Sequence, residues 1–177
     1  LEDGTRPIPV QEQAVRALFY LTTANTQDDT TTTTDTTDTD TTITTNANVR
    51  ICRNMLDCCT SSQSGVSLQR WALATLQNCI PPILSQKEEE FDFVSCGAIM
   101  ILCSLLSSDD ADIRNHATAA LTATLYSSPT QSNNIASSIY ESGALQTSLV
   151  QMLLSADTAV VTMACTFVKC LLLTHNA

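Results

Sequence analysis

Aliphatic residues recur along the chain with a spacing typical of α-helices that pack side by side. Ile113, Ala117 and Leu121 are each four residues apart, and positions i, i+4 and i+8 share one face of a helix. A small residue between two larger ones lets a neighbouring helix axis approach within about 8–10 Å. The same pattern of aliphatic residue, alanine and aliphatic residue recurs as Val10/Ala14/Leu18, Leu68/Ala72/Leu76 and Val160/Ala164/Val168.

The four central alanines are expected to be buried where helices cross. Ala72 and Ala117 are 45 residues apart, and Ala117 and Ala164 are 47 residues apart. These intervals match the period of roughly 40–47 residues that is typical of two- and three-helix repeat arrays. The interval from Ala14 to Ala72 is longer, and the Thr-rich tract between them accounts for the excess. The pattern therefore predicts stacked helical repeats.

The tract from Thr22 to Thr45 consists mainly of threonine with interspersed aspartates, and Ile43 is its only large aliphatic residue. Threonine is a mediocre helix former, and a segment without an apolar period cannot offset its ordering entropy by burial. We expect a disordered loop over 22–45 that enlarges one connection between repeats. We interpret it as a low-complexity expansion; the alternative is a regulatory strip of phospho-acceptor threonines.

Outside this tract, periodic segments predict helices separated by turns. Gly97 and Gly143 each interrupt the chain where a short helix turns into the next one, which favours a positive φ. Helix caps are expected before two periodic segments, within the run Ser107-Ser108-Asp109-Asp110 and at Asp157. A helix starting at Val66 should end near Ile80, because Pro81-Pro82 removes two backbone donors. The other helices are expected at 9–21, 46–59, 87–95, 98–106, 111–126, 133–141, 145–154 and 158–173.

Two stretches of the chain, Ser95 to Asp109 with Ile113 to Leu121 and Glu141 to Asp157 with Val160 to Leu171, follow one another as two units. They resemble consecutive repeats of the armadillo family. The resemblance implies an all-α, right-handed α-solenoid whose third helices line a concave groove that binds partner proteins. It divides the chain into the end of a first repeat at 1–21, the insert at 22–45, and further repeats at 46–86, 87–130 and 131–177. Because the chain starts at Leu1 and opens almost directly into a repeat's last helix, we expect a part of a longer array.

The resemblance also implies where a peptide would bind. In importin-α and β-catenin relatives the third helix carries a Trp two residues after the conserved Ala and an Asn six residues after it. The corresponding Trp positions here are Arg16, Ala74, Ala119 and Thr166, and the Asn positions are Tyr20, Asn78, Ala123 and Cys170. Only Asn78 matches, which argues against importin-like recognition of a basic extended peptide.

The groove can also be predicted from helix geometry. On each third helix the residues one before, two after and six after the alanine share a face at i, i+3 and i+7. These stripes are Gln13/Arg16/Tyr20, Trp71/Ala74/Asn78, His116/Ala119/Ala123 and Met163/Thr166/Cys170. A Trp beside Arg and Tyr has the composition of an interface hot spot. The predicted binding residues are Arg16, Tyr20, Trp71, Asn78 and His116; the alternative is that Trp71 packs between repeats and His116 is an ordinary surface residue.

The composition limits the kinds of partner that the chain is expected to bind. The 18 acidic and 8 basic residues give a net charge of −10, which disfavours nucleic acids and anionic membrane surfaces. No apolar run reaches the roughly 20 residues that span a bilayer. The 8 cysteines include no Cys-x-x-Cys pair and there are 2 histidines, so we expect no metal site and reduced, packed thiols in the cytoplasm or nucleus.

No catalytic constellation is apparent. The two histidines lie in no motif with Ser or Cys, and four scattered glycines form no phosphate-binding loop. We therefore expect a non-enzymatic scaffold that binds a protein or peptide, without a cofactor or small-molecule substrate. The alternative is a regulatory or oligomerising section of a larger enzyme such as a ubiquitin ligase.

Overall fold

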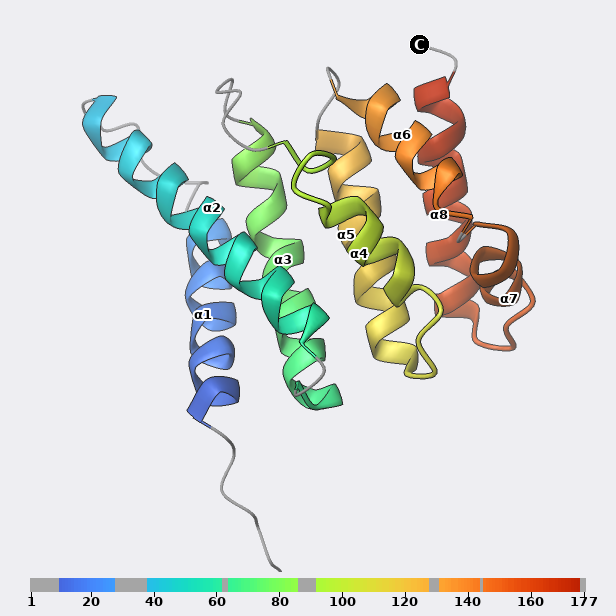
Figure 1. Cartoon of the computed structure of the whole chain (residues 1–177), viewed down its shortest axis with the longest axis horizontal. Coiled ribbons are helices and arrows are strands. Elements are labelled where there is room, and N and C mark those ends of the chain that lie inside the picture. Colours follow the sequence, from blue (N-terminus) through green and yellow to red (C-terminus); the bar gives the residue numbers. More distant parts are fainter. Residues whose placement is uncertain are drawn as a thin grey trace, which may run out of the picture.

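The described part of the chain folds into a series of packed helices, as the computed structural model in Figure 1 shows. The structure describes residues 10–27, 38–61, 64–85, 92–127, 131–143 and 145–175, and within these ranges it contains helices and no strand. The all-α prediction is therefore confirmed for the described part. None of the described helices combines the length and the apolarity that crossing a membrane requires.

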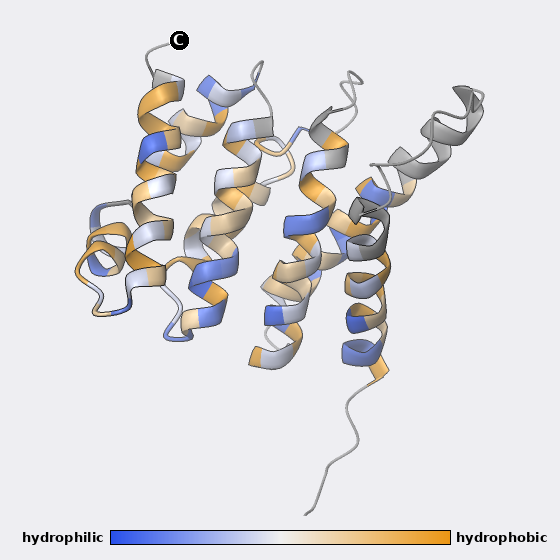
Figure 2. Cartoon of the chain, turned by 180° about the vertical axis from the view of Figure 1, so that it is seen from behind, coloured by the Kyte–Doolittle hydropathy of each residue, from blue (hydrophilic) through white to orange (hydrophobic). Residues whose placement is uncertain are grey.

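The helices form two layers (Figures 1 and 2). One layer holds α1, α3, α5 and α8 side by side, with α3 between α1 and α5, and α5 between α3 and α8. The other layer holds α2 against α3, α4 against α5, and α6 and α7 against α8. The bounds are α1 Val10–Gln27, α2 Asp38–Thr60, α3 Val66–Ser85, α4 Ala98–Leu105, α5 Ala111–Ser127, α6 Ser132–Glu141, the π-helix η2 Leu145–Leu149, α7 Val150–Leu153 and α8 Thr158–His175.

The predicted caps and turns are confirmed. The Ile113 amide donates to Asp110 Oδ1 at 3.1 Å, and the Ala159 amide donates to Asp157 Oδ1 at 2.9 Å, so each carboxylate satisfies a donor at a helix start. Gly97 and Gly143 have φ values of 76° and 69°, in the left-handed region where a side chain is unfavourable. Each glycine therefore turns the chain just before its next helix.

The core lies between the two layers and contains three of the four repeated alanines. Ala72, Ala117 and Ala164 are each 0% exposed, as the pattern predicted. Ala14 is exposed, and among the side chains of α1 that the structure describes, 10–23, the buried one is Val15, at 4% exposure. The prediction for Ala14 is wrong because α1 packs on α3 through a face displaced by one residue, which leaves Val10 at the helix start 81% exposed.

The predicted disordered loop is wrong at both of its ends. α1 continues to Gln27 and α2 starts at Asp38, so parts of the Thr-rich tract are helical; its middle, 28–37, lies outside the described residues. Thr22 and Thr23 accept helical geometry because their hydroxyls donate to the Phe19 carbonyl at 2.9 and 2.8 Å. The packing of α1 on α3 thus overrides the low helix propensity of these β-branched threonines.

α3 also runs further than predicted, through Pro81-Pro82 to Ser85. The two prolines cannot donate to the preceding turn, which should end a helix in isolation. Ile80 is fully buried and Ile83 is 5% exposed, so the burial of side chains on both sides of the prolines compensates for the missing hydrogen bonds. The helix expected over 87–95 is also wrong at its end, since 93–97 form a turn in which Phe93 is buried; 86–91 lie outside the described residues.

Candidate functional site

The predicted binding residues lie on the helices of one layer, α1, α3, α5 and α8. We call the surface of this layer that faces away from α2, α4 and α6 the four-helix face; it faces the viewer in Figure 2. Arg16 and Tyr20 come from α1, Trp71 and Asn78 from α3, and His116 from α5. The structure distributes these five residues over three separate local clusters.

The first cluster joins α1 to α3 through aromatic rings. The Arg16 guanidinium carbon lies 4.9 Å from the centroid of the Trp71 ring, a cation–π contact. The Phe19 and Tyr20 rings lie 5.4 and 6.2 Å from the Trp71 ring, centroid to centroid. Tyr20 is 59% exposed, whereas Trp71 is only partly exposed. Trp71 therefore both packs between two helices and presents an edge to solvent, so each of the two readings of this residue describes part of its environment.

Asn78 and His116 form the other two clusters. The Asn78 side-chain amide donates to Thr23 Oγ1 at 2.9 Å, which links α3 to α1. His116 Nδ1 lies 3.4 Å from Gln77 Oε1, which links α5 to α3. Both side chains are partly buried. In this structure each therefore bridges neighbouring helices, and a partner would compete with these bonds for the amide or the ring.

Charged side chains of Arg70 and of residues at the start of α5 lie near His116. Arg70 Nε donates to Asp110 Oδ1 at 3.0 Å, and an Arg70 terminal nitrogen lies 3.3 Å from Asp112 Oδ2. The hydrogen bonds from Arg70 lower the pKa of the Asp110 carboxyl. Burial lowers the pKa of His116, and Arg70 adds to this effect while Asp112 opposes it. His116 is thus held as a neutral ring at neutral pH.

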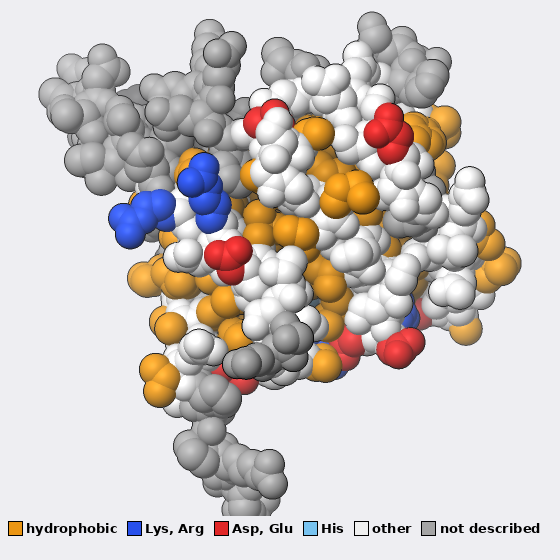
Figure 3. All heavy atoms as spheres, in the orientation of Figure 1, with side chains coloured by type: hydrophobic (Ala, Val, Ile, Leu, Met, Phe, Trp, Pro, Cys, Tyr) orange, Lys and Arg blue, Asp and Glu red, His pale blue; other side chains and the backbone are white. Residues whose placement is uncertain are grey.

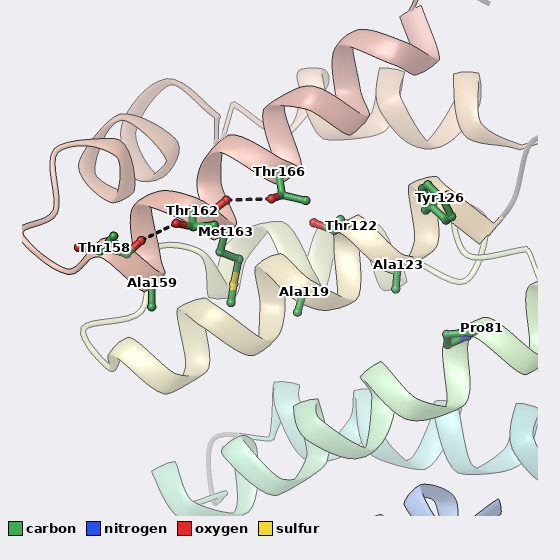
Figure 4. Close-up of a pocket in the computed structure, with 10 residues that line it drawn as sticks. All are labelled: Pro81, Ala119, Thr122, Ala123, Tyr126, Thr158, Ala159, Thr162, Met163 and Thr166. Atoms are coloured by element: carbon green, nitrogen blue, oxygen red, sulfur yellow. Dashed lines mark hydrogen bonds between the residues drawn. The ribbon is translucent and has the colours of Figure 1, made fainter. Parts of the chain in front are cut away.

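A groove of about 810 Å³ opens on the four-helix face between α5 and α8 (Figure 4). Its volume lies within the roughly 300–1,000 Å³ typical of ligand sites. No lining side chain carries a charge. The lining residues are Pro81, Ala119, Thr122, Ala123, Tyr126, Thr158, Ala159, Thr162, Met163 and Thr166. We call this the α5–α8 groove.

Four residues of the predicted stripes line this groove: Ala119 and Ala123 on α5, and Met163 and Thr166 on α8. The lining of this groove includes none of the five residues predicted to bind, which are Arg16, Tyr20, Trp71, Asn78 and His116. Sequence reasoning missed Thr122 and Thr162, which lie three residues after Ala119 and four before Thr166. It also missed Phe19, because the pattern on α1 was centred on Ala14 and the structure buries Val15, four residues before Phe19, instead.

Three of the four threonine hydroxyls that line the groove share one hydrogen-bonding arrangement. Thr122 Oγ1 donates to the Thr118 carbonyl at 2.8 Å, and Thr162 Oγ1 donates to the Thr158 carbonyl at 2.8 Å. Thr166 Oγ1 donates to the Thr162 carbonyl at 2.9 Å (Figure 4). A hydroxyl has a single proton, so these three oxygens keep only acceptor capacity for a ligand.

All eight cysteines are free thiols, and Cys52, Cys59, Cys79 and Cys103 are buried as small hydrophobic groups. Burial raises the pKa of Cys59 to about 12. A hydrogen bond with the Cys79 thiol, together with burial, raises the pKa of Cys52 well above its ordinary value. Over the described residues, no three side chains of His, Cys, Asp or Glu lie close enough to hold a metal ion.

The opposite side of the molecule, formed by α2, α4 and α6, differs in character from the groove. Figure 3 shows basic side chains over α2, separate acidic side chains, and uncharged surface between them. A polar hollow of about 540 Å³ on this side is lined by Asp92, Gln131, Asn134 and Glu141, among others. The Asp92 carboxylate there already accepts from the Val94 and Ser95 amides.

Comparison with known proteins gives a likeness in fold alone. No family model and no curated protein matches the chain. The crystal structure of one engineered protein, from the Northeast Structural Genomics Consortium, aligns with a TM-score of 0.61 and 20% identity over 92% of this chain and 57% of its own. A second engineered protein from the same consortium aligns with a TM-score of 0.51 and 19% identity over 89% of this chain and 62% of its own. The chain thus spans less than two thirds of the length of either structure.

Proposed function

We propose that this chain is a non-enzymatic interaction module, an armadillo-type right-handed α-solenoid that binds a protein or peptide along the four-helix face. The observation that carries the proposal is the α5–α8 groove. Ala119 and Ala123 of α5 and Met163 and Thr166 of α8, all of them in the predicted stripes, line this one groove, to which Pro81 of α3 also contributes. The exposed rim of the Arg16–Trp71–Tyr20 cluster lies on the same face and adds a second contact region.

Several features support binding over catalysis. The groove has no charged lining residue, and three of its threonine hydroxyls donate to carbonyls of their own helices. Acyl or phosphoryl transfer needs an activated nucleophile or a charged clamp. His116 bonds to the Gln77 amide and not to a Ser or Cys. An apolar surface with few polar groups that fix orientation is typical of recognition sites.

Three tyrosines allow a matched test of the binding face. Tyr20 is 59% exposed in the aromatic cluster and Tyr126, at 81%, lines the groove, while Tyr140, at 47%, lies on α6 in the other layer. Each would be replaced singly by photoreactive benzoylphenylalanine, and each protein would be exposed to peptides selected from a random phage-displayed library on the parent protein. We expect crosslinks from positions 20 and 126 and none from position 140. Crosslinks from position 140 alone would show that binding lies on the other layer.

A further inference from the structure

We infer that the chain has a second binding site, for a fatty-acid anion, on a face of α8 outside the α5–α8 groove. A groove of about 500 Å³ opens there between α7 and α8, and we call it the α7–α8 groove. It shares no lining residue with the α5–α8 groove. The lining residues are Leu153, Cys165, Val168, Lys169, Leu172 and Leu173. The two sites can therefore be tested independently.

The outer face of α8 is more apolar than a surface helix requires. α8 packs on α5, α6 and α7 and ends its layer of helices (Figure 2). Four residues of its outer face follow the spacing i, i+3, i+4 and i+7 and so lie together: Cys165, Val168, Lys169 and Leu172. Leu172 is 55% exposed, and Leu153, on the α7 side of the groove, is 38% exposed. A surface helix normally turns polar residues to solvent, and contiguous exposed apolar side chains mark binding sites.

Lys169 carries the charge of this lining. Within the part of the chain that the structure describes, its ammonium has no hydrogen-bond or ion-pair partner. The segment 115–177 has one basic residue, Lys169, and two acidic residues, Glu141 and Asp157, neither of which lines the groove. The net charge of −10 thus resides mainly elsewhere, and an anionic head group is complementary to this site. A single ammonium balances one negative charge, which suits a carboxylate better than a phosphate dianion.

The position of Lys169 within the apolar stripe limits the shape of the occupant. A partner helix is about 10–12 Å across, so one that covered Val168 and Leu172 would also bury the ammonium between them, at a desolvation cost. A single aliphatic chain is narrow enough to lie against the same two side chains while the lysine stem lies beside it and the ammonium stays in water. Each methylene that the groove buries adds to the affinity. A fatty-acid anion combines such a chain with a carboxylate for Lys169.

Cys165 provides a direct reporter of occupancy, because its free thiol is exposed and lines the groove. Its alkylation by iodoacetamide would be followed by mass spectrometry, with dodecanoate below its micelle-forming concentration as the probe. Cys96 is the matched control, since it is also a free, exposed thiol but lies before α4 and outside the groove. We expect dodecanoate above its Kd to slow the alkylation of Cys165 by about fivefold or more, because only the unoccupied fraction reacts, and to leave Cys96 unchanged.

Changes of tail, head group and lysine identify what the groove recognises. From octanoate to dodecanoate the affinity should rise about two- to fourfold per methylene, since each one buries more apolar area. Dodecyltrimethylammonium has the same tail and the opposite charge and should protect Cys165 less. Lys169→Glu should weaken dodecanoate binding about three- to tenfold, because it reverses one partner of an exposed ion pair. Arg50→Glu is the matched control, since it makes the same change of charge at an exposed site on α2.

Each outcome supports or overturns the inference. Selective protection of Cys165, a rise with tail length, and sensitivity to Lys169→Glu but not to Arg50→Glu support it. Absence of protection, equal protection of Cys96, or equal protection by dodecyltrimethylammonium overturns it. Protection of Cys165 by phosphatidylserine vesicles but not by dodecanoate would also overturn it and indicate a membrane surface. Protection that needs only a higher protein concentration would overturn it by showing that a second copy covers the groove.

Discussion

At the scale of single residues, the alanines of the repeated pattern differ because their surroundings differ. Ala117 is completely buried in a helix that packs against α3 on one side and α8 on the other. Ala14 occupies the same place in the pattern on α1 but is exposed. The sequence pattern alone cannot distinguish the two, because both alanines are flanked by aliphatic residues four positions away. Burial depends on the neighbouring helices, which the local sequence does not encode.

This contrast makes a matched pair for a stability measurement. Ala117→Leu inserts three extra carbons where no space exists, and overpacking of this kind costs about 1–3 kcal/mol. Ala14→Leu adds the same atoms at an exposed site and should change the free energy of unfolding by less than about 0.5 kcal/mol. Chemical denaturation monitored by circular dichroism measures both. Equal stability of the two variants would show that Ala117 is not at a tight crossing.

The lowered pKa of His116 predicts that the stability of the protein depends on pH. Burial holds its pKa in the folded state below the ordinary 6.5, so the unfolded chain takes up the proton first as the pH falls. Stability should therefore decrease as the pH drops below about 6.5 and level off, for this group, below the folded-state pKa. Above pH 7 the ring is neutral in both states and contributes no slope.

The His116→Gln variant tests this dependence. Glutamine can still bond to Gln77, but it cannot titrate. The difference in unfolding free energy between parent and variant, measured by urea denaturation from pH 5 to pH 8, isolates His116 because every other titrating group is shared. We expect the difference to favour the variant increasingly toward pH 5. A difference that is independent of pH, or of opposite sign, would contradict a lowered pKa.

At the scale of helices, periodicity and capping predicted most elements but not their ends. α5, α6 and α8 lie within one or two residues of the predicted ranges, because an aliphatic period, a capping aspartate or a glycine marks each of them. α3 passes through Pro81-Pro82, because the burial of Ile83 outweighs the missing hydrogen bonds. The predicted stripes contain four of the residues that line the groove, but the five residues selected for binding lie outside its lining. The threonine hydrogen bonds in the groove depend on rotamers that only the structure reveals.

Replacing glycine should reduce stability only where the backbone has a positive φ, as in the turns before α4 and η2. Gly97 and Gly143 have positive φ, and an added Cβ would meet nothing within 4 Å at either position. Replacement by alanine should therefore cost about 1–2 kcal/mol through backbone conformation alone. Gly65, before α3, also has open space around it but no positive φ, so Gly65→Ala should be nearly neutral. Thermal unfolding of the three variants measures this; equal effects at all three would contradict the conformational explanation.

At the scale of the whole molecule, the core is unevenly shared between the helices. A continuous cluster extends from Val15 in α1 to Leu171 in α8 and is densest where α3 and α5 are enclosed by neighbours in both layers. Met152, Val160 and Ala164 form a separate small cluster between α7 and the first half of α8. One contact that links this cluster to α5 is the Thr118 hydroxyl, 3.6 Å from the Met152 sulfur. The two parts of the core can therefore open with different free energies.

Hydrogen exchange should reveal this difference. Amides of α3 and α5 should exchange most slowly, since opening either helix disrupts packing on both sides and approaches global unfolding. Amides of η2, α7 and the first two turns of α8 should exchange earlier, because the buried side chains of this part belong mainly to the small cluster, which has fewer members than the main core. Mass spectrometry of deuterated peptides measures this order in the parent protein. Met152→Ala should speed exchange in α7 and the start of α8 and leave α3 unchanged; a uniform acceleration across all helices would show that the molecule opens as a single unit.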